Sequence, residues 1–132
     1  MKKIDDTPKP RGELALQSVA MPRDTNANGD IFGGWLVSEM DLAGLVTASR
    51  IAKGRVVTVA IDKMSFMVPV PVGAVVSCYS RVANVGRSSI QVEVEVWMYQ
   101  PEDQSRQVKV TEGTFVFVAV DSNGRTRSIA TK

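Results

Sequence analysis

One helical segment followed by a series of strand segments is the pattern that most restricts how this chain can fold. Residues 35–53 contain no proline and only one internal glycine, Gly44, and their length and apolar spacing predict a helix that ends near Gly54. After Gly54 the apolar residues recur with the period of a strand. A chain of 132 residues is long enough for one core but too short for two domains. A single helix is therefore expected to pack against a single sheet.

The clearest predicted strand covers residues 89–99, where apolar and polar residues alternate. Further strands are expected over residues 13–20, 56–62 with an extension through 63–68, 74–85 and 108–120. The order of strand, long loop, helix and about four strands predicts an α+β fold, in which an antiparallel sheet covers the helix. Because one helix cannot cover both faces of such a sheet, we expect the chain to oligomerise through a sheet edge or face.

Both ends of the chain are polar and are expected to lie outside the folded domain. Residues 1–11 predict a flexible lead, residues 12–127 the domain, and residues 128–132 a C-terminal tail. The lead lacks the apolar centre of a signal peptide, and no apolar run approaches the ~20 residues of a membrane helix. The single cysteine, Cys78, cannot form an internal disulfide. The default location is the cytoplasm, with no membrane partner.

The absence of histidine restricts the chemistry more than any other feature of the composition. It excludes Ser-His-Asp and Cys-His catalysis and any zinc site that uses histidine, and one cysteine is too few for a thiolate metal site. An enzyme made from this chain has to use carboxylates, amides, hydroxyls and backbone donors. A net charge of +2, without a run of basic residues, does not indicate a nucleic-acid partner.

Asp41 is the first candidate for a catalytic carboxylate. On a helical wheel it falls within about 40° of the apolar residues Val37, Leu45 and Ala48. The wheel places Asp41 on the apolar side of the helix, where the loss of its solvent shell would suit a general base or a nucleophile. The alternative is a structural aspartate that hydrogen-bonds a loop backbone or caps a neighbouring element.

Gly33 and Gly34 precede the predicted helix, where backbone N–H groups have no partner within the helix. A glycine pair lets a substrate approach the backbone closely, and the helix dipole adds partial positive charge. The Gly34 N–H is therefore a candidate oxyanion donor; the alternative is an ordinary glycine-rich entry turn. In the loop before it, Asn26, Asn28 and Asp30 supply polar groups that either serve turns or orient a water or a substrate carbonyl.

A basic turn connects the predicted strands 74–85 and 89–99. Arg87, two hydroxyls and a backbone opened by Gly86 form a set of groups that can grip a phosphate. The alternative is a hairpin with a solvated arginine. Cys78 lies in the middle of the preceding strand and is interpreted as a small core residue, because no base is available to activate it.

The segment AMPRDTNANGDIFGGWLVSEMD resembles the signature of the YciA-type acyl-CoA thioesterases of the hotdog superfamily. The resemblance continues through GRVVTVAIDKMSFMVPVPVGAVVSCYSRV, VGRSSIQVEVEVW and TFVFVAVDSNGR, and covers roughly residues 12–127. It implies a single hotdog domain, in which a long antiparallel sheet wraps around one central helix. It also implies hydrolysis of acyl-CoA to a free acid and CoA, without a metal or an organic cofactor. Dimers would be the minimal active unit, and relatives commonly assemble as trimers of dimers.

The resemblance also assigns roles to residues. The catalytic acid of the family falls on Asp41, the loop asparagine on Asn26, and the oxyanion donor at the helix start on Gly34, beside Gly33. The turn that binds the CoA phosphates resembles Gly86, Arg87, Ser88 and Ser89. Because the family builds its site between two subunits, the resemblance implies that Asn26 and Asp41 come from opposite chains.

The chain departs from the family pattern after Asp41, where relatives often carry two adjacent glycines, and after Trp97, where they tend to be lysine-rich. The first change implies a reshaped acyl pocket, and the second less positive charge near CoA. An alternative function is a hotdog protein that binds acyl-CoA without hydrolysing it. A hotdog dehydratase usually needs an active-site histidine, which this chain does not have.

Overall fold

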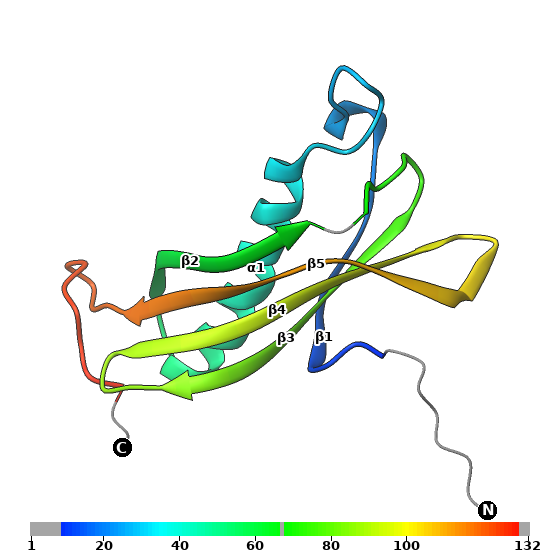
Figure 1. Cartoon of the computed structure of the whole chain (residues 1–132). Helices are drawn as coiled ribbons and strands as arrows, with labels where there is room; N and C mark the ends of the chain where they lie inside the picture. Colours follow the sequence, from blue (N-terminus) through cyan, green and yellow to red (C-terminus); the bar gives the residue numbers. More distant parts are fainter. Residues whose placement is uncertain (1–8, 67, 130–132) are drawn as a thin grey trace, which may run out of the picture.

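A computed structural model describes residues 9–66 and 68–129, and it shows one helix packed against one face of a five-stranded antiparallel sheet (Figure 1). The elements are β1 (Glu13–Val19), the 3-10 helix η1 (Pro22–Asp24), α1 (Gly33–Ala52), β2 (Val56–Phe66), β3 (Val75–Val85), β4 (Ser89–Gln100) and β5 (Asp103–Ala119). The strand order is β1-β3-β4-β5-β2. The predicted α+β fold, with a long sheet around one central helix, is confirmed.

The sheet extends further than the sequence indicated. β5 begins at Asp103 and not at residue 108, because β4 and β5 stay paired as far as Gln100 and Asp103, close to the turn that joins them. The first residues of β5 are polar and exposed, so their side chains give no apolar alternation from which a strand can be predicted. Helix α1 likewise begins at Gly33, so the glycine pair forms its first two residues and does not precede it.

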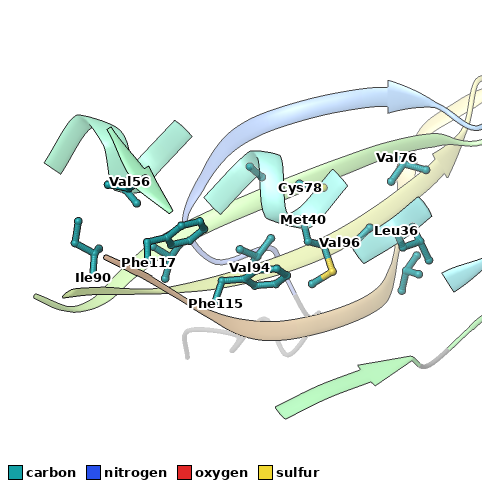
Figure 2. Close-up of a cluster of buried hydrophobic side chains, with 14 of the residues drawn as sticks. Leu36, Met40, Val56, Val76, Cys78, Ile90, Val94, Val96, Phe115 and Phe117 are labelled. Atoms are coloured by element: carbon teal, nitrogen blue, oxygen red, sulfur yellow. The ribbon is translucent and has the colours of Figure 1, made fainter. Parts of the chain in front are cut away.

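The core lies between α1 and the sheet (Figure 2). On β4 the alternation predicted from the sequence is observed, with Ile90, Val92, Val94 and Val96 fully buried and Met98 half-buried. On β5, Phe115 and Phe117 point to the same face, and their ring centroids lie 6.5 Å apart. Burial of these large apolar side chains is the main term that stabilises the fold.

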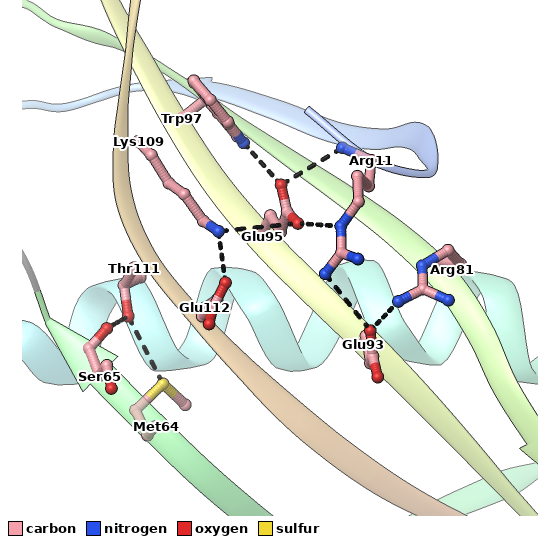
Figure 3. Close-up of polar contacts among 10 residues, drawn as sticks. All are labelled: Arg11, Met64, Ser65, Arg81, Glu93, Glu95, Trp97, Lys109, Thr111 and Glu112. Carbon is pink, nitrogen blue, oxygen red and sulfur yellow. Dashed lines mark hydrogen bonds and ion pairs between the residues drawn. The ribbon is translucent and has the colours of Figure 1, made fainter. Parts of the chain in front are cut away.

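A network of charged residues covers the other face of the sheet (Figure 3). Glu95 is only 5% exposed, and its carboxylate accepts hydrogen bonds from Trp97 Nε1 at 2.9 Å and Arg11 Nε at 3.0 Å. Burial alone would raise the pKa of Glu95, but these hydrogen bonds, with the charge of Lys109, hold the pKa below its usual value. Arg11, at the end of the segment predicted to be a flexible lead, is thus bonded to the sheet; residues 1–8 lie outside the described residues.

The two edges of the sheet are β1 and β2, and β2 is the more open of the two. Residues 59–63 of β2 are all exposed, including Val59 at 55% and Ile61 at 46%. The strand is irregular at two places, between Thr58 and Ala60 and between Asp62 and Ser65. An exposed edge strand with apolar side chains is the kind of surface that another strand pairs with.

No helix in the described part of the chain is both long enough and apolar enough to cross a lipid bilayer.

Gly44 lies in the middle of α1, close to side chains of the sheet. A Cβ atom at this position would lie 2.9 Å from Cε2 and Cζ of Phe117, which is fully buried and cannot move freely. We therefore expect Gly44→Val to lower the free energy of unfolding by about 2–3 kcal/mol through overpacking. Urea unfolding measures the change. The control, Arg50→Val, places the same side chain on the exposed face of α1 and is expected to cost about 0.5 kcal/mol. Equal losses in the two variants would contradict the close contact.

Candidate active site

The first turn of α1 presents two backbone N–H groups without a partner. Phe32 is the N-cap residue, has extended backbone angles, and provides no side-chain cap. The Trp35 N–H donates to the Phe32 carbonyl at 3.1 Å, whereas the N–H groups of Gly33 and Gly34 donate to no other described residue. These two donors lie at the positive end of the dipole of a 20-residue helix. Together they form a site suited to a carbonyl oxygen that gains negative charge.

A cavity of about 320 Å³ adjoins this helix start. It is lined by Asn26, Asp30, Ile31, Gly33, Leu36, Phe66, Val68, Pro69 and Val70. Most of its wall is apolar, with polar groups only from the loop and from the helix backbone. A Cβ atom at Gly33 would lie 3.5 Å from the Phe66 ring, so the absence of a side chain keeps the approach to the backbone open.

The oxygen and the nitrogen of the Asn26 side-chain amide have different roles. Its Oδ1 accepts the N–H groups of Asn28 at 2.9 Å and Asp30 at 3.2 Å, which closes the loop on itself. The backbone adds a further bond, from the Asn26 N–H to the Asp30 carbonyl at 2.7 Å. Asn26 Nδ2 donates to no described residue, and the residue lines the cavity. The loop therefore uses the side-chain oxygen and leaves the NH₂ group as a donor for another molecule.

Asp41 lies at the border of the buried side of α1. Its carboxylate is half-buried, and its Oδ1 accepts the Thr58 hydroxyl of β2 at 2.6 Å. Of its predicted apolar neighbours, Ala48 is buried while Val37 and Leu45 are half-buried. The fully buried stripe of the helix lies to one side and comprises Leu36, Met40, Ala43 and Thr47 among others. Asp41 thus faces the open edge strand.

Asp41 does not line the cavity that contains Asn26 and Gly33. Along a helix that rises 1.5 Å per residue, Asp41 lies about 10 Å from Gly34. Its side chain is directed to Thr58 and not toward the helix start. Within one chain, therefore, the structure brings Asn26 and the glycine pair together, but not Asp41.

The turn between β3 and β4 is held firmly by its backbone. The Gly86 N–H donates to the Ser89 carbonyl, the Ala119 N–H to the Ser88 carbonyl, and the Ile129 N–H to the Arg87 carbonyl, each at 2.8 Å. In contrast, the Arg87 guanidinium and the hydroxyls of Ser88 and Ser89 make no hydrogen bond to another described residue. The turn lies at the end of the molecule that holds the C-terminus of α1, away from the loop before the helix (Figure 1).

Cys78 is buried on β3, as the sequence predicted for a core residue. Burial, with a smaller contribution from the negative charge of Glu39, raises the pKa of its thiol to about 12. Cys78 is therefore not a nucleophile. Residues 9–66 and 68–129 also contain no group of three or more Cys, Asp or Glu side chains placed to hold a metal ion.

Comparison with known proteins identifies close relatives. The profile of the thioesterase superfamily matches residues 28–103. The acyl-CoA thioester hydrolase YciA of Salmonella typhimurium is 50% identical over 131 residues, which cover 98% of this chain and 97% of that protein. An uncharacterized acyl-CoA thioester hydrolase of Haemophilus influenzae is 54% identical over 121 residues, or 90% of this chain and 79% of that protein.

Solved structures agree with these matches. The hexameric thioesterase y2039 of Yersinia pestis has a TM-score of 0.89 and 50% identity, and the alignment covers 94% of this chain and all of that chain. HI0827, described as a hexameric broad specificity acyl-coenzyme A thioesterase, has a TM-score of 0.88 and 50% identity over 95% of this chain and 86% of that one. A third, a hexameric hotdog fold thioesterase of Campylobacter jejuni, has a TM-score of 0.84 and 44% identity over 90% of this chain and 91% of that one.

The environment of Cys78 predicts an inert thiol. With a pKa of about 12, only about one thiol in ten thousand is ionised at pH 8. A disulfide reagent such as dithionitrobenzoate should therefore label the native protein very slowly, and should label one thiol per chain at once in urea. Labelling of the native protein within a minute would show that Cys78 is more accessible than its burial indicates.

Proposed function

Because the chain belongs to the YciA-type acyl-CoA thioester hydrolases of the thioesterase superfamily, we propose that Asp41 is the carboxylate with which it hydrolyses acyl-CoA. The enzyme class follows from the family, and the proposal concerns the residues and their arrangement. The observation that carries it is the pair of unpartnered N–H groups at Gly33 and Gly34, beside a largely apolar cavity that Asn26 also lines.

The thioester carbonyl would bind at the start of α1. Its oxygen gains negative charge as the carbonyl carbon becomes tetrahedral, and the Gly34 N–H together with the helix dipole stabilises that charge. The apolar wall formed by Leu36, Phe66 and Val70 would receive the acyl chain or the pantetheine arm. Asn26 Nδ2 would hold the carbonyl oxygen or the attacking water.

A second copy of the chain supplies the carboxylate in this proposal. Asp41 is bonded to Thr58 near one end of β2, and the Phe66 ring at the other end lies beside Gly33. If β2 pairs antiparallel with its own copy about a point near Asp62, Thr58 of one protomer lies opposite the partner's Phe66. Asp41 then approaches the partner's helix start. The exposed apolar side chains of β2 and its unpaired edge support this pairing.

Two chemical routes fit this arrangement. In the first, Asp41 removes a proton from a water molecule that attacks the carbonyl carbon, and the carbon–sulfur bond breaks to release CoA. In the second, Asp41 attacks the carbonyl carbon directly, the carbon–sulfur bond breaks to release CoA, and water hydrolyses the mixed anhydride that has formed. Single-turnover hydrolysis in water enriched in the heavy oxygen isotope tests the first route. Label found in Asp41 excludes that route, because it enters Asp41 only when water attacks the Asp41 carbon of a mixed anhydride.

The turn between β3 and β4 would bind the phosphates of CoA. Within residues 9–66 and 68–129, the Arg87 guanidinium and the two adjacent serine hydroxyls have no hydrogen-bond partner, and they stand on a backbone fixed by three hydrogen bonds. The homodimer is the minimal active unit in this proposal. Since several relatives are described as hexameric, we propose that three such dimers assemble.

Replacement of Asp41 tests the catalytic assignment. Asp41→Asn keeps the shape and can still accept the Thr58 hydrogen bond, but it removes the base or nucleophile. We expect it and Asp41→Ala to lower kcat/KM for acyl-CoA at least about a hundredfold, or about 2.7 kcal/mol of barrier lowering. Release of free thiol from a panel of acyl-CoA esters measures the rate.

The control for this test is Glu39→Gln, which removes the other carboxylate of the same helix; it is half-buried, and glutamine can still accept the hydrogen bond that the Ser18 hydroxyl donates to Glu39. It should change the rate less than twofold. If Asp41→Asn retains activity near that of the wild type, Asp41 is not the catalytic carboxylate. If the wild type binds acyl-CoA but releases no thiol, the protein is a binding module and not a hydrolase.

Mixed oligomers test whether the site is shared between chains. Asp41→Asn and Asn26→Ala chains, each inactive alone, are unfolded, mixed in equal amounts and refolded together. If the two residues come from opposite chains, half of the dimers are mixed and each has one intact site, so about a quarter of the wild-type activity returns. If both residues of a site come from one chain, no site is intact and no activity returns. Refolded wild type sets the scale.

A further inference from the structure

The C-terminal segment of the described chain ties the phosphate-binding turn to the end of α1. Residues 121–129, here called the tail clasp, follow β5, make a turn and return to the end of that strand. The Asp121 side chain closes the first turn by accepting the N–H groups of Asn123 and Arg125, each at 2.9 Å. The Arg127 N–H then donates to the Ala119 carbonyl at 3.0 Å, and the Ile129 N–H to the Arg87 carbonyl at 2.8 Å.

Arg127 holds the clasp in place through its side chain. Its Nη2 donates to the Ala52 carbonyl at 2.9 Å and its Nε to the Val120 carbonyl at 3.1 Å. Ala52 is the last residue of α1, so its carbonyl has no partner within the helix. A cation at this end also interacts favourably with the helix dipole. The guanidinium lies over Gly54, where a Cβ atom would be 2.8 Å from Nη2.

Arg127 and Arg87 differ in what their guanidinium groups contact. The Arg127 guanidinium is occupied by three main-chain carbonyls: Ala52 at the end of α1, Val120 directly after β5, and Ser128 of the clasp at 3.5 Å. That of Arg87 is exposed and has no described partner. The chain therefore places a structural arginine two residues from Ile129, whose amide fixes the backbone of Arg87. The half-buried Ile129 side chain packs against the core, and this packing helps to fix the Ile129 amide that bonds to Arg87.

We propose that Arg127 is a positioning residue for binding of the CoA phosphates, acting through the tail clasp on Arg87. This inference rests on the proposed role of the β3–β4 turn. Without the Arg127 fork, the clasp loses its bonds to α1 and Val120, and the Ile129 bond to the Arg87 carbonyl weakens with it. The turn then samples more conformations, and each phosphate contact has to be made at an entropic cost.

The test compares acyl-CoA with the matching acyl-pantetheine thioester, which has the same reacting bond but no phosphate. For Arg127→Ala we expect KM for acyl-CoA to rise about tenfold with kcat changed less than twofold. KM and kcat for acyl-pantetheine should stay at the wild-type values, which also shows that the variant is folded. Exchange of the Ile129 amide hydrogen should become faster, because the clasp that carries this donor is no longer held.

Two further variants separate positioning from charge. Arg127→Lys keeps the positive charge but cannot bond the carbonyls with a planar fork, so it should resemble Arg127→Ala. Arg125→Ala removes an exposed arginine from the same clasp whose side chain bonds no described residue, and should leave KM within about twofold of the wild type. If Arg127→Lys retains the wild-type KM, or Arg125→Ala raises KM equally, charge and not positioning is responsible and the inference fails.

Arg87→Ala shows which of the two proposals fails. If it leaves the KM for acyl-CoA unchanged, the phosphate site is wrongly assigned, and the proposed role of the turn falls with the inference. If Arg87→Ala raises KM and Arg127→Ala does not, the phosphate site stands and the inference alone is overturned. If the protein binds acyl-CoA without hydrolysing it, the dissociation constants of acyl-CoA and acyl-pantetheine, measured by calorimetry, replace the KM values in the same comparison.

Discussion

The contact between the middle of α1 and the centre of the sheet fixes the rest of the molecule. One helix has to cover a five-stranded sheet, and Gly44 lets it approach the Phe117 ring without an intervening side chain. Because the helix is held at its middle, both of its ends are available for other contacts. The N-terminal N–H groups meet the cavity, and the C-terminal carbonyl of Ala52 meets Arg127. In the proposed site, one end of this helix would meet a substrate, while its other end is bonded to residues 121–129.

The same rigidity sets a limit on what one chain can do. Asp41 and Gly34 lie about 10 Å apart along α1, which is further than rotation of an aspartate side chain can span, so within one chain the carboxylate does not reach the N–H donor. A carboxylate and an oxyanion donor that act on one carbonyl have to lie within a few ångströms of it. The two-fold pairing of β2 proposed above would meet this requirement without a change of fold, since it would bring Asp41 of one helix to the start of the other. The open edge of β2 would then be part of the active site and not only an assembly surface.

The sequence predicted the elements with strong patterns and missed those that depend on long-range contacts. The alternation of Ile90, Val92 and Val94 was sufficient to place β4, and the apolar spacing of residues 35–53 was sufficient for the helix. The start of β5 was missed because its polar side chains form a strand only through pairing with β4. The candidate residues came from motifs and from the family resemblance. The role of Arg127 has no local signal, because the carbonyl that it binds in Ala52 is 75 residues away in the chain.

The polar groups of this chain divide into those that the fold uses and those that it leaves without partners. Glu95, Arg127 and the Asn26 oxygen are fully engaged, and each fixes backbone or strand positions. The Gly33 and Gly34 N–H groups, Asn26 Nδ2 and the Arg87 guanidinium are unbonded in the described part of the chain, yet each is attached to a backbone held by several hydrogen bonds. Free donors on a rigid backbone cost the protein internal hydrogen bonds, and that cost is recovered when a ligand accepts them. All of these donors would meet an anion or a carbonyl oxygen, which is the chemistry of a thioester attached to a phosphorylated carrier.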